Sequence, residues 1–299
     1  MDLLDYRIVT ELIRDPTAPY EVIGSRVGLS GVSARRRVLG MFRSGFIRGL
    51  HLLPSPLNFH MYPGTFVFRG IQEPSRRLRE IADISGVAFA WLDYDGDMTV
   101  TLFFRQKEEE RSSVERLSEV LSVEAVARRT PLSLMPPDLS GSYLSRVDLR
   151  ILEHICRDPR VPLKEVSRLT GLSGKTVGKH KARMLSSNQL CTIFIPDFTR
   201  SQGGIFYALL VYPGDLRATS TLQGMGLQAI WHMVDPPCYV FMGYADSLDE
   251  VEANKNRIKD TGLVKGLSTL VPRGGIFAVK NVTAWIRERV LEWGMASVR

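Results

Sequence analysis

The chain has 299 residues, of which 44% are hydrophobic and 24% charged, enough to bury more than one hydrophobic core. No apolar run approaches the roughly 20 residues that span a bilayer, and the start Met1-Asp2-Leu3 lacks the basic region of a secretory signal, so we expect a cytoplasmic protein without a membrane partner. The net charge of +7 is concentrated, because residues 1–53 carry 8 Lys/Arg against 5 Asp/Glu and residues 143–195 carry 10 against 4. That distribution indicates a nucleic-acid partner.

Three helices are expected in the first 44 residues. The first covers residues 4–14, with apolar residues on one face and Asp15-Pro16 as its stop. The second covers residues 20–27 and follows Pro19. A Gly28-Leu29 turn then leads to a third helix, which has Ser30 as its N-cap. This third helix buries one apolar stripe and exposes a run of arginines, namely Arg35, Arg36 and Arg37.

The alternating segment Phe46 to Leu53 predicts a two-stranded wing, so residues 1–55 are expected to form a winged helix-turn-helix. In that motif the third helix lies in the major groove of double-stranded DNA, where its first residues reach base edges and neighbouring basic residues bind phosphate. We expect the bases to be contacted by Val32, Ser33 and Arg36. The full set of predicted DNA-binding residues here is Ser30, Val32, Ser33, Arg35, Arg36, Arg37 and Arg43.

A second domain is expected after a short linker, Pro54 to Asn58. Strand and helix patterns then follow in the order βαββαβ, which predicts a ferredoxin-like domain over residues 60–131. Asp95-Gly96 lies between two of its strands and is typical of a hairpin turn. Residues 132–142 have the composition of a linker.

The second half repeats the first at a constant offset of 143 residues, which aligns Gly28-Leu29-Ser30-Gly31 with Gly171-Leu172-Ser173-Gly174. The repeat indicates a tandem duplication. It predicts a second winged helix-turn-helix over 143–198, a second ferredoxin-like domain over 203–273 and a terminal helix over 281–294. The fold class is therefore α+β, with two tandem units. DNA-binding residues expected in the second copy are Ser173, Lys175, Thr176, Lys179, His180 and Arg183.

Nothing in the sequence favours a metal site or a catalytic site. The three cysteines are far apart, and the five histidines lack metal-ligand spacing. No G-x-S-x-G nucleophile motif occurs. We therefore expect no catalytic residues, no metal and no cofactor, and a protein that is not an enzyme.

The chain resembles the Lrp/AsnC (feast/famine) transcriptional regulators. The matching residues include Leu4-Asp5-x-x-Ile8, Gly28-Leu29-Ser30 and Gly45-Phe46-Ile47 in the first half, and Asp148-x-x-Ile151-Leu152 with Gly171-Leu172-Ser173 in the second. The resemblance implies a sequence-specific regulator that binds double-stranded DNA and self-associates through its ferredoxin-like (RAM-like) domains. It also implies a small-molecule effector such as an amino acid, with Asp95 and Asp97 as candidate ligand-binding residues.

Two alternatives stay open at this stage. The same two-domain unit resembles siroheme decarboxylases, for which His60-Met61-Tyr62 and His232 are the corresponding segments. That alternative does not require basic recognition helices, whereas both third helices here are basic. The other alternative is a winged-helix adaptor for protein partners, whose binding would be insensitive to salt.

Overall fold

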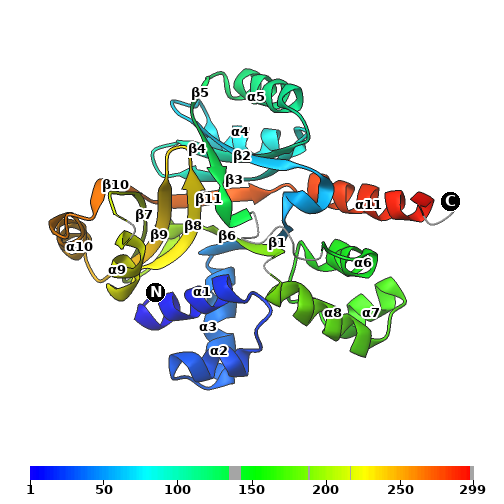
Figure 1. The fold of residues 1–299 in the computed structure, drawn as a ribbon. Helices are drawn as coiled ribbons and strands as arrows, with labels where there is room; N and C mark the ends of the chain where they lie inside the picture. The colour runs from blue at the N-terminus through cyan, green and yellow to red at the C-terminus, as the bar shows by residue number, and fades with distance from the viewer. Residues whose placement is uncertain (135–142, 188, 216, 297–299) are drawn as a thin grey trace.

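The computed structural model describes residues 1–134, 143–187, 189–215 and 217–296, so most of the predicted linker 132–142 lies outside the described residues. The fold is α+β, as predicted, and consists of two units with the same element order. In Figure 1 both helix-turn-helix units lie on the lower side of the molecule, and the strands form the layer above them. Within the described residues, no helix is long and apolar enough to cross a membrane.

The first head, as we call residues 1–55, contains three helices around one apolar core. Pro19 precedes the second helix, and Gly28 closes it in the left-handed conformation (φ 76°), which turns the chain into the third helix. Ile8, Leu12 and Val38 are fully buried between the helices. The helices are α1 (Leu3–Arg14), α2 (Tyr20–Val27) and α3 (Gly31–Arg43).

The second head, residues 143–198, repeats this arrangement. Gly171 takes the place of Gly28 with φ 71°. Both heads begin with a capping box, formed by Asp2 and Asp5 in the first and by Ser145 and Asp148 in the second. The helices are α6 (Arg146–Ile155), α7 (Leu163–Thr170) and α8 (Gly174–Ser186).

The expected two-stranded wing is corrected by the structure. Phe46 to Leu53 does not fold back on itself; it belongs to one strand, β1 (Ile47–Pro54), which pairs antiparallel with β6 (Leu190–Pro196) of the other head. Most of β1 is buried, so both of its faces need apolar cover that a surface hairpin would lack. The two heads are therefore joined by a β-ladder.

The expected linker from Pro54 to Asn58 is a buried junction. Residues Pro56–Phe59 form a 3₁₀ turn, and Asn58 is 2% exposed. Its side chain donates to Gln189 Oε1 at 3.0 Å and accepts from the Leu144 backbone N–H at 2.8 Å. This amide ties the first unit to both ends of the second head.

The two ferredoxin-like domains form one sheet of nine strands. The first domain contributes β2 to β5, covered by α4 and α5, and the second contributes β7 to β10, covered by α9 and α10 (Figure 1). The order is β10-β7-β9-β8-β5-β2-β4-β3-β11, with a short contact between β5 and β8 in the middle. The bounds are β2 (Tyr62–Phe68), α4 (Pro74–Glu80), β3 (Val87–Asp93), β4 (Met98–Phe104), α5 (Lys107–Leu121), β5 (Ala125–Pro131), β7 (Ile205–Pro213), α9 (Ala218–Gly224), β8 (Gln228–Val234), β9 (Cys238–Ala245), α10 (Leu248–Asp260) and β10 (Val264–Leu270).

The last strand makes the sheet curl. β11 (Pro272–Phe277) follows β10 after a single residue, Val271, yet the two strands lie at opposite ends of the strand order. Val271 donates its backbone N–H to Asp93 Oδ1 at 2.6 Å, which fixes this connection to β3. The sheet therefore bends so far that its two ends are bridged by one residue, and its inner face encloses a space.

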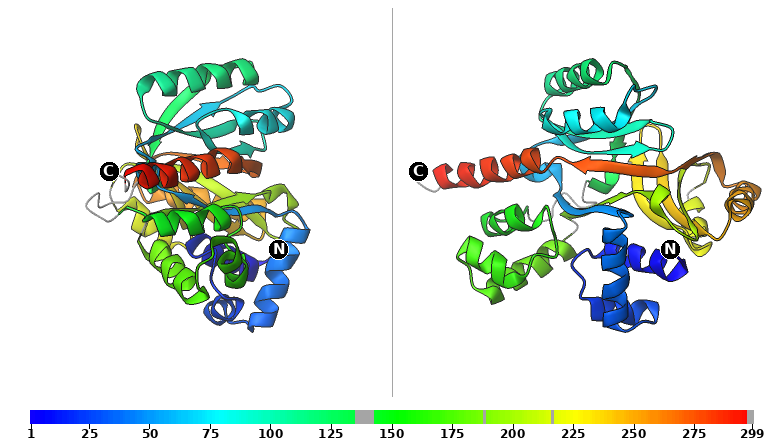
Figure 2. Two further views of the ribbon diagram at one scale, coloured as in Figure 1. Left: turned by 90° about the vertical axis from the view of Figure 1, so that its right-hand side faces the viewer. Right: turned by 180° about the vertical axis from the view of Figure 1, so that it is seen from behind.

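The terminal helix α11 (Val279–Ala296) extends two residues beyond the predicted span at each end. It runs from the end of β11 toward α6 of the second head (Figure 2). Trp285 is 8% exposed and stacks on Phe103 with ring centroids 5.2 Å apart. The helix thus packs on its own chain.

Candidate functional sites

The recognition helix of the first head presents free basic side chains. Arg35, Arg36 and Arg43 are exposed, and none forms an ion pair within the described residues. Val32, near the start of α3, is 81% exposed. Ser30 caps the helix, because its Oγ accepts the Ser33 backbone N–H at 3.2 Å. The exposed set combines cations with an apolar contact residue at the helix start.

Arg37 differs from the other arginines of α3. Its Nη1 lies 2.9 Å from Asp2 Oδ2 and 2.9 Å from Asp5 Oδ1, both in the capping box of α1. These hydrogen bonds, first of all the one to Asp5, raise the pKa of Arg37 above its ordinary value. Arg37 therefore locks α3 to the start of α1.

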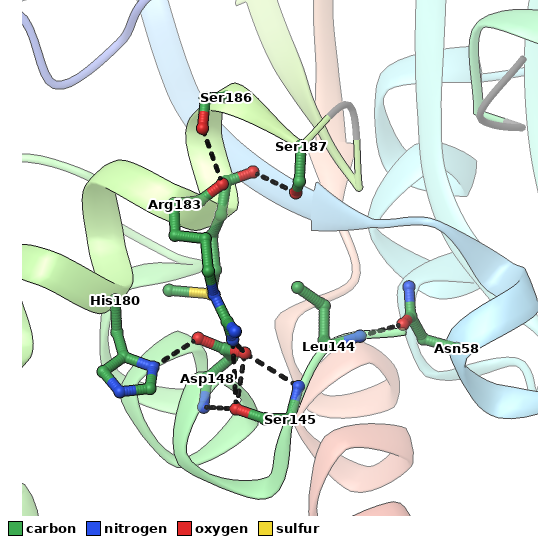
Figure 3. A network of polar contacts seen from close by, with 9 residues as sticks. Asn58, Leu144, Ser145, Asp148, His180, Arg183, Ser186 and Ser187 are labelled. Carbon is green, nitrogen blue, oxygen red and sulfur yellow. Dashed lines mark hydrogen bonds and ion pairs between the residues drawn. The ribbon is translucent and has the colours of Figure 1, made fainter. Parts of the chain in front are cut away.

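The second head carries an equivalent lock (Figure 3). His180 and Asp148 occupy the repeat positions of Arg37 and Asp5, and His180 Nδ1 lies 2.7 Å from Asp148 Oδ1. Arg183 pairs with the other carboxylate oxygen, and Ser145 donates its backbone N–H at 2.7 Å. Burial alone would raise the pKa of Asp148, but the bonds from Ser145 and His180 and the Arg183 charge hold it below its ordinary value.

The rest of α8 is less basic on its surface than its sequence suggests. Lys175 and Lys179 are exposed, and neither forms an ion pair within the described residues. Ser173 caps the helix by accepting the Thr176 backbone N–H at 3.1 Å. Lys181 is partly buried and donates to the Pro159 carbonyl at 2.7 Å, and burial lowers its pKa. Helix α8 therefore offers fewer free cations than α3.

The two heads touch through Arg160, in the loop between α6 and α7. Its guanidinium donates to the carbonyls of Pro16 at 3.0 Å and Ala18 at 2.9 Å, and it lies 4.2 Å from the centroid of the Tyr20 ring. Hydrogen bonds and a cation–π contact thus hold the second head against the first.

A cavity of about 300 Å³ lies on the inner face of the curled sheet. Phe89, Trp91 and Trp231 form an aromatic wall, with centroids 5.3 Å apart for the two indoles. Ile13 of α1 lines it from the first head, and Phe194 of β6 and Phe198 line it from the second. The cavity is therefore lined by both sheet domains and by both heads.

Two arginines line this cavity, Arg69, which pairs with Asp97, and Arg129 of β5. Arg129 is 9% exposed, and its Nη2 donates to Tyr212 Oη at 2.6 Å. Burial raises the pKa of the nearby Cys238 thiol, and the Arg129 charge opposes that rise. Within the described residues Arg129 has no carboxylate partner, and its Nε has no hydrogen-bond acceptor.

Of the two residues predicted to bind an effector, Asp97 is among the residues that line this cavity and Asp95 is not. Asp97 lines it and pairs with Arg69 at 3.0 Å, while Asp95 Oδ1 accepts the Asp97 backbone N–H at 3.0 Å and stabilises the hairpin turn. Both carboxylates are thus used within the turn. Burial and the Asp95 charge raise the pKa of Asp97.

The residues singled out for tetrapyrrole chemistry lie elsewhere. His60 is exposed, and Tyr62 is 57% exposed. The His232 ring stacks on Tyr239 with centroids 4.2 Å apart. None of these three is among the described residues that line the cavity, and the described part of the chain contains no cluster of His, Cys, Asp or Glu suited to a metal ion.

Sequence reasoning missed Arg129, although a signal was present. Arg128 and Arg129 are consecutive in a strand, so their side chains point to opposite faces of the sheet. Arg128 pairs with Glu110 of α5 on the helix-covered face. The second arginine must therefore point inward.

Comparisons with known proteins identify the heads. Residues 1–41 match the AsnC-type helix-turn-helix domain, and residues 144–188 match a winged helix-turn-helix DNA-binding domain. No curated protein matches the chain.

Among solved structures, the chain is similar to the siroheme decarboxylase NirDL, with 13% identity, 97% of this chain and 99% of that chain covered, and a TM-score of 0.47. It is also similar to an AsnC family transcriptional regulator from Agrobacterium tumefaciens, with 24% identity, 43% and 86% coverage, and a TM-score of 0.31. The expectation that the chain is not an enzyme is contradicted by the first comparison, because a decarboxylase matches it over nearly its full length. We withdraw that expectation.

Proposed function

From the premise that this chain belongs with the Lrp/AsnC family through its AsnC-type helix-turn-helix, we propose that it binds double-stranded DNA and regulates transcription. The observation that carries the proposal is the unpaired, exposed set Arg35, Arg36 and Arg43 on α3. An exposed cation on a recognition helix is free to replace the counterions of phosphate. Lys175 and Lys179 are exposed on α8 and can bind phosphate in the same way.

In this proposal the predicted DNA-binding residues divide into two groups. Val32, Ser33 and Arg36 face the bases, while Arg35 and Arg43 bind phosphate. A second group holds the recognition helices in place; its members are Ser30, Ser173, Arg37, His180 and Arg183. The support is the set of bonds that each makes to its own head.

The test is a selection of bound fragments from total genomic DNA at 50 mM and 200 mM salt, followed by sequencing. We expect one enriched sequence class whose retention falls steeply between the two salt concentrations. Binding that is equal at both concentrations would favour the adaptor alternative. Failure to retain any duplex at 50 mM salt would refute the proposal.

A second candidate function concerns the cavity and uses a different part of the chain. It is tetrapyrrole chemistry of the kind named for NirDL, and the observation that favours it is Arg129, a buried cation able to bind a carboxylate side arm. The cavity volume of about 300 Å³ is at the lower limit of ligand pockets, so a macrocycle would require the sheet domains to move apart.

Incubation of the purified chain with siroheme tests this candidate. A shifted Soret band and loss of carboxylate groups from the pigment, detected by mass spectrometry, would support it. An unchanged absorption spectrum at equimolar protein would exclude it.

A further inference from the structure

We propose that the cavity on the inner face of the curled sheet is a binding site for a small aromatic monocarboxylate, whose carboxylate pairs with Arg129 and whose ring packs on Trp91 and Trp231. The inference does not depend on DNA binding, because the cavity and the recognition helices use different residues.

The first argument is the charge of Arg129. A guanidinium stays protonated at any pH at which the protein is folded. Burying such a charge is costly unless an anion compensates it. Arg129 is 9% exposed and donates to the Tyr212 phenol, but no carboxylate in the described part of the chain pairs with it, although Asp93 and Asp97 line the same cavity. The guanidinium is therefore open to a ligand carboxylate.

The second argument is hydrogen-bonding geometry. Arg129 Nη2 donates to Tyr212 Oη at 2.6 Å, which fixes one end of the guanidinium. Its Nε is buried and has no acceptor in the described residues. A carboxylate accepts two parallel hydrogen bonds from the planar fork of a guanidinium. The guanidinium of Arg129 is therefore only partly satisfied by the described residues.

The third argument concerns the body of the ligand. The same cavity is lined by the aromatic wall, with Phe89 4.8 Å from Trp91 and 5.4 Å from Trp231 between ring centroids. Trp91 is held in place because its Nε1 donates to the Phe194 carbonyl at 3.0 Å. Fixed aromatic faces bind a planar apolar group by offset or edge-to-face packing. The volume of about 300 Å³ limits the ligand to about one ring and a short acidic arm.

The rim of the cavity selects against further negative charge. Asp97 lies there, paired with Arg69 at 3.0 Å, and Asp93 lines the interior. Burial raises the pKa of Asp93, and the charges of Asp95 and Asp97 raise it further. A dicarboxylate would place its second charge near these acids, so a monocarboxylate fits better.

The experiment is calorimetric titration of the full-length chain with phenylacetate and with its neutral isostere phenylacetamide. Tryptophan fluorescence gives a second readout, because Trp91 and Trp231 line the site. Phenylacetate should bind at least about tenfold more tightly than phenylacetamide, since only the acid forms charge-assisted hydrogen bonds. Equal affinity for both, or no binding of phenylacetate up to 10 mM (about 10,000-fold weaker than a micromolar site), would overturn the inference.

A matched pair of variants locates the site. Arg129→Met should lose about tenfold or more in phenylacetate affinity and should melt at the same or a higher temperature without ligand, because an uncompensated buried charge is removed. Arg128→Met, on the opposite face of the same strand, should bind phenylacetate as the wild type does. Unchanged binding of phenylacetate by Arg129→Met, or binding of siroheme alone, would overturn the inference. If a variant misfolds, the comparison of phenylacetate with phenylacetamide on the wild type still tests it.

Discussion

The salt dependence of DNA binding separates the two kinds of arginine on α3. Five exposed cations on the recognition helices form no ion pair in the described residues, namely Arg35, Arg36, Arg43, Lys175 and Lys179. If each replaces one counterion, the logarithm of the association constant should fall with the logarithm of salt concentration at a slope of about −4.5. The double variant Arg35→Ala/Arg43→Ala should reduce this slope to about −2.7 and weaken binding about 60-fold at 0.1 M salt.

Arg37→Ala should behave differently, although it removes the same charge from the same helix. It leaves Asp5, whose side chain is 10% exposed, without its cation, so the free energy of unfolding should fall by about 1–2 kcal/mol. The salt slope should stay near the wild-type value. Urea denaturation and fluorescence anisotropy with one labelled operator fragment measure the two effects on the same samples.

The control for net charge is Arg111→Ala/Arg116→Ala on α5, where both arginines are exposed and far from the heads. It should leave the salt slope unchanged. If this variant lowers the slope as much as Arg35→Ala/Arg43→Ala, binding reflects overall charge. A reduced slope in Arg37→Ala with unchanged stability would refute the proposed division of roles.

Three further predictions concern the stability of the heads and the terminal helix. Asp148→Asn should lower the free energy of unfolding by about 3 kcal/mol at pH 7. Because the pKa of Asp148 is depressed in the folded state, this difference from the wild type should be complete above about pH 4 and should disappear as the pH falls below it. Urea titrations at several pH values measure the difference. Arg160→Ala removes two hydrogen bonds and the contact with Tyr20, so spin labels on the two heads should give a broader distance distribution, and an unchanged distribution would argue against this contact. Trp285→Ala should cost about 3–5 kcal/mol of packing and expose α11 to limited proteolysis, whereas protection equal to wild type would contradict its role in docking the helix.

The element order could be predicted from the sequence because the periodic patterns are local. Helices α2 and α8 begin close to their capping signals at Pro19 and Ser173. The 143-residue repeat added a second estimate of every boundary. Local patterns and repetition therefore sufficed for the fold class.

Pairing between distant segments could not be predicted in this way. The pattern of Phe46 to Leu53 fits a hairpin as well as a strand whose partner, β6, is more than 130 residues away. β11 escaped notice because Gly274 and Gly275 weaken its strand propensity, and its partner β3 lies far back in the chain. Strand partners are set by tertiary packing, which a local pattern does not contain.

The roles of individual site residues were only partly accessible. The run Arg35 to Arg37 looks uniform in sequence, and only the fold places Asp2 and Asp5 beside the third arginine. The repeat contained a hint, since position 37 is arginine in one copy and histidine in the other, while Asp5 and Asp148 are both retained. An arginine in one copy and a histidine in the other, each facing the same retained acid, indicate a structural pair.

The β1–β6 ladder has a consequence for how this protein works at low abundance. Two separate half-length chains joined by such a ladder would dissociate on dilution, and the concentration of complete pairs would then fall with the square of the chain concentration. Here both strands belong to one polypeptide, so the effective concentration of each strand for the other is fixed by the tether. A single translated molecule therefore carries a complete pair of heads, and occupancy of a target should rise linearly with gene dosage.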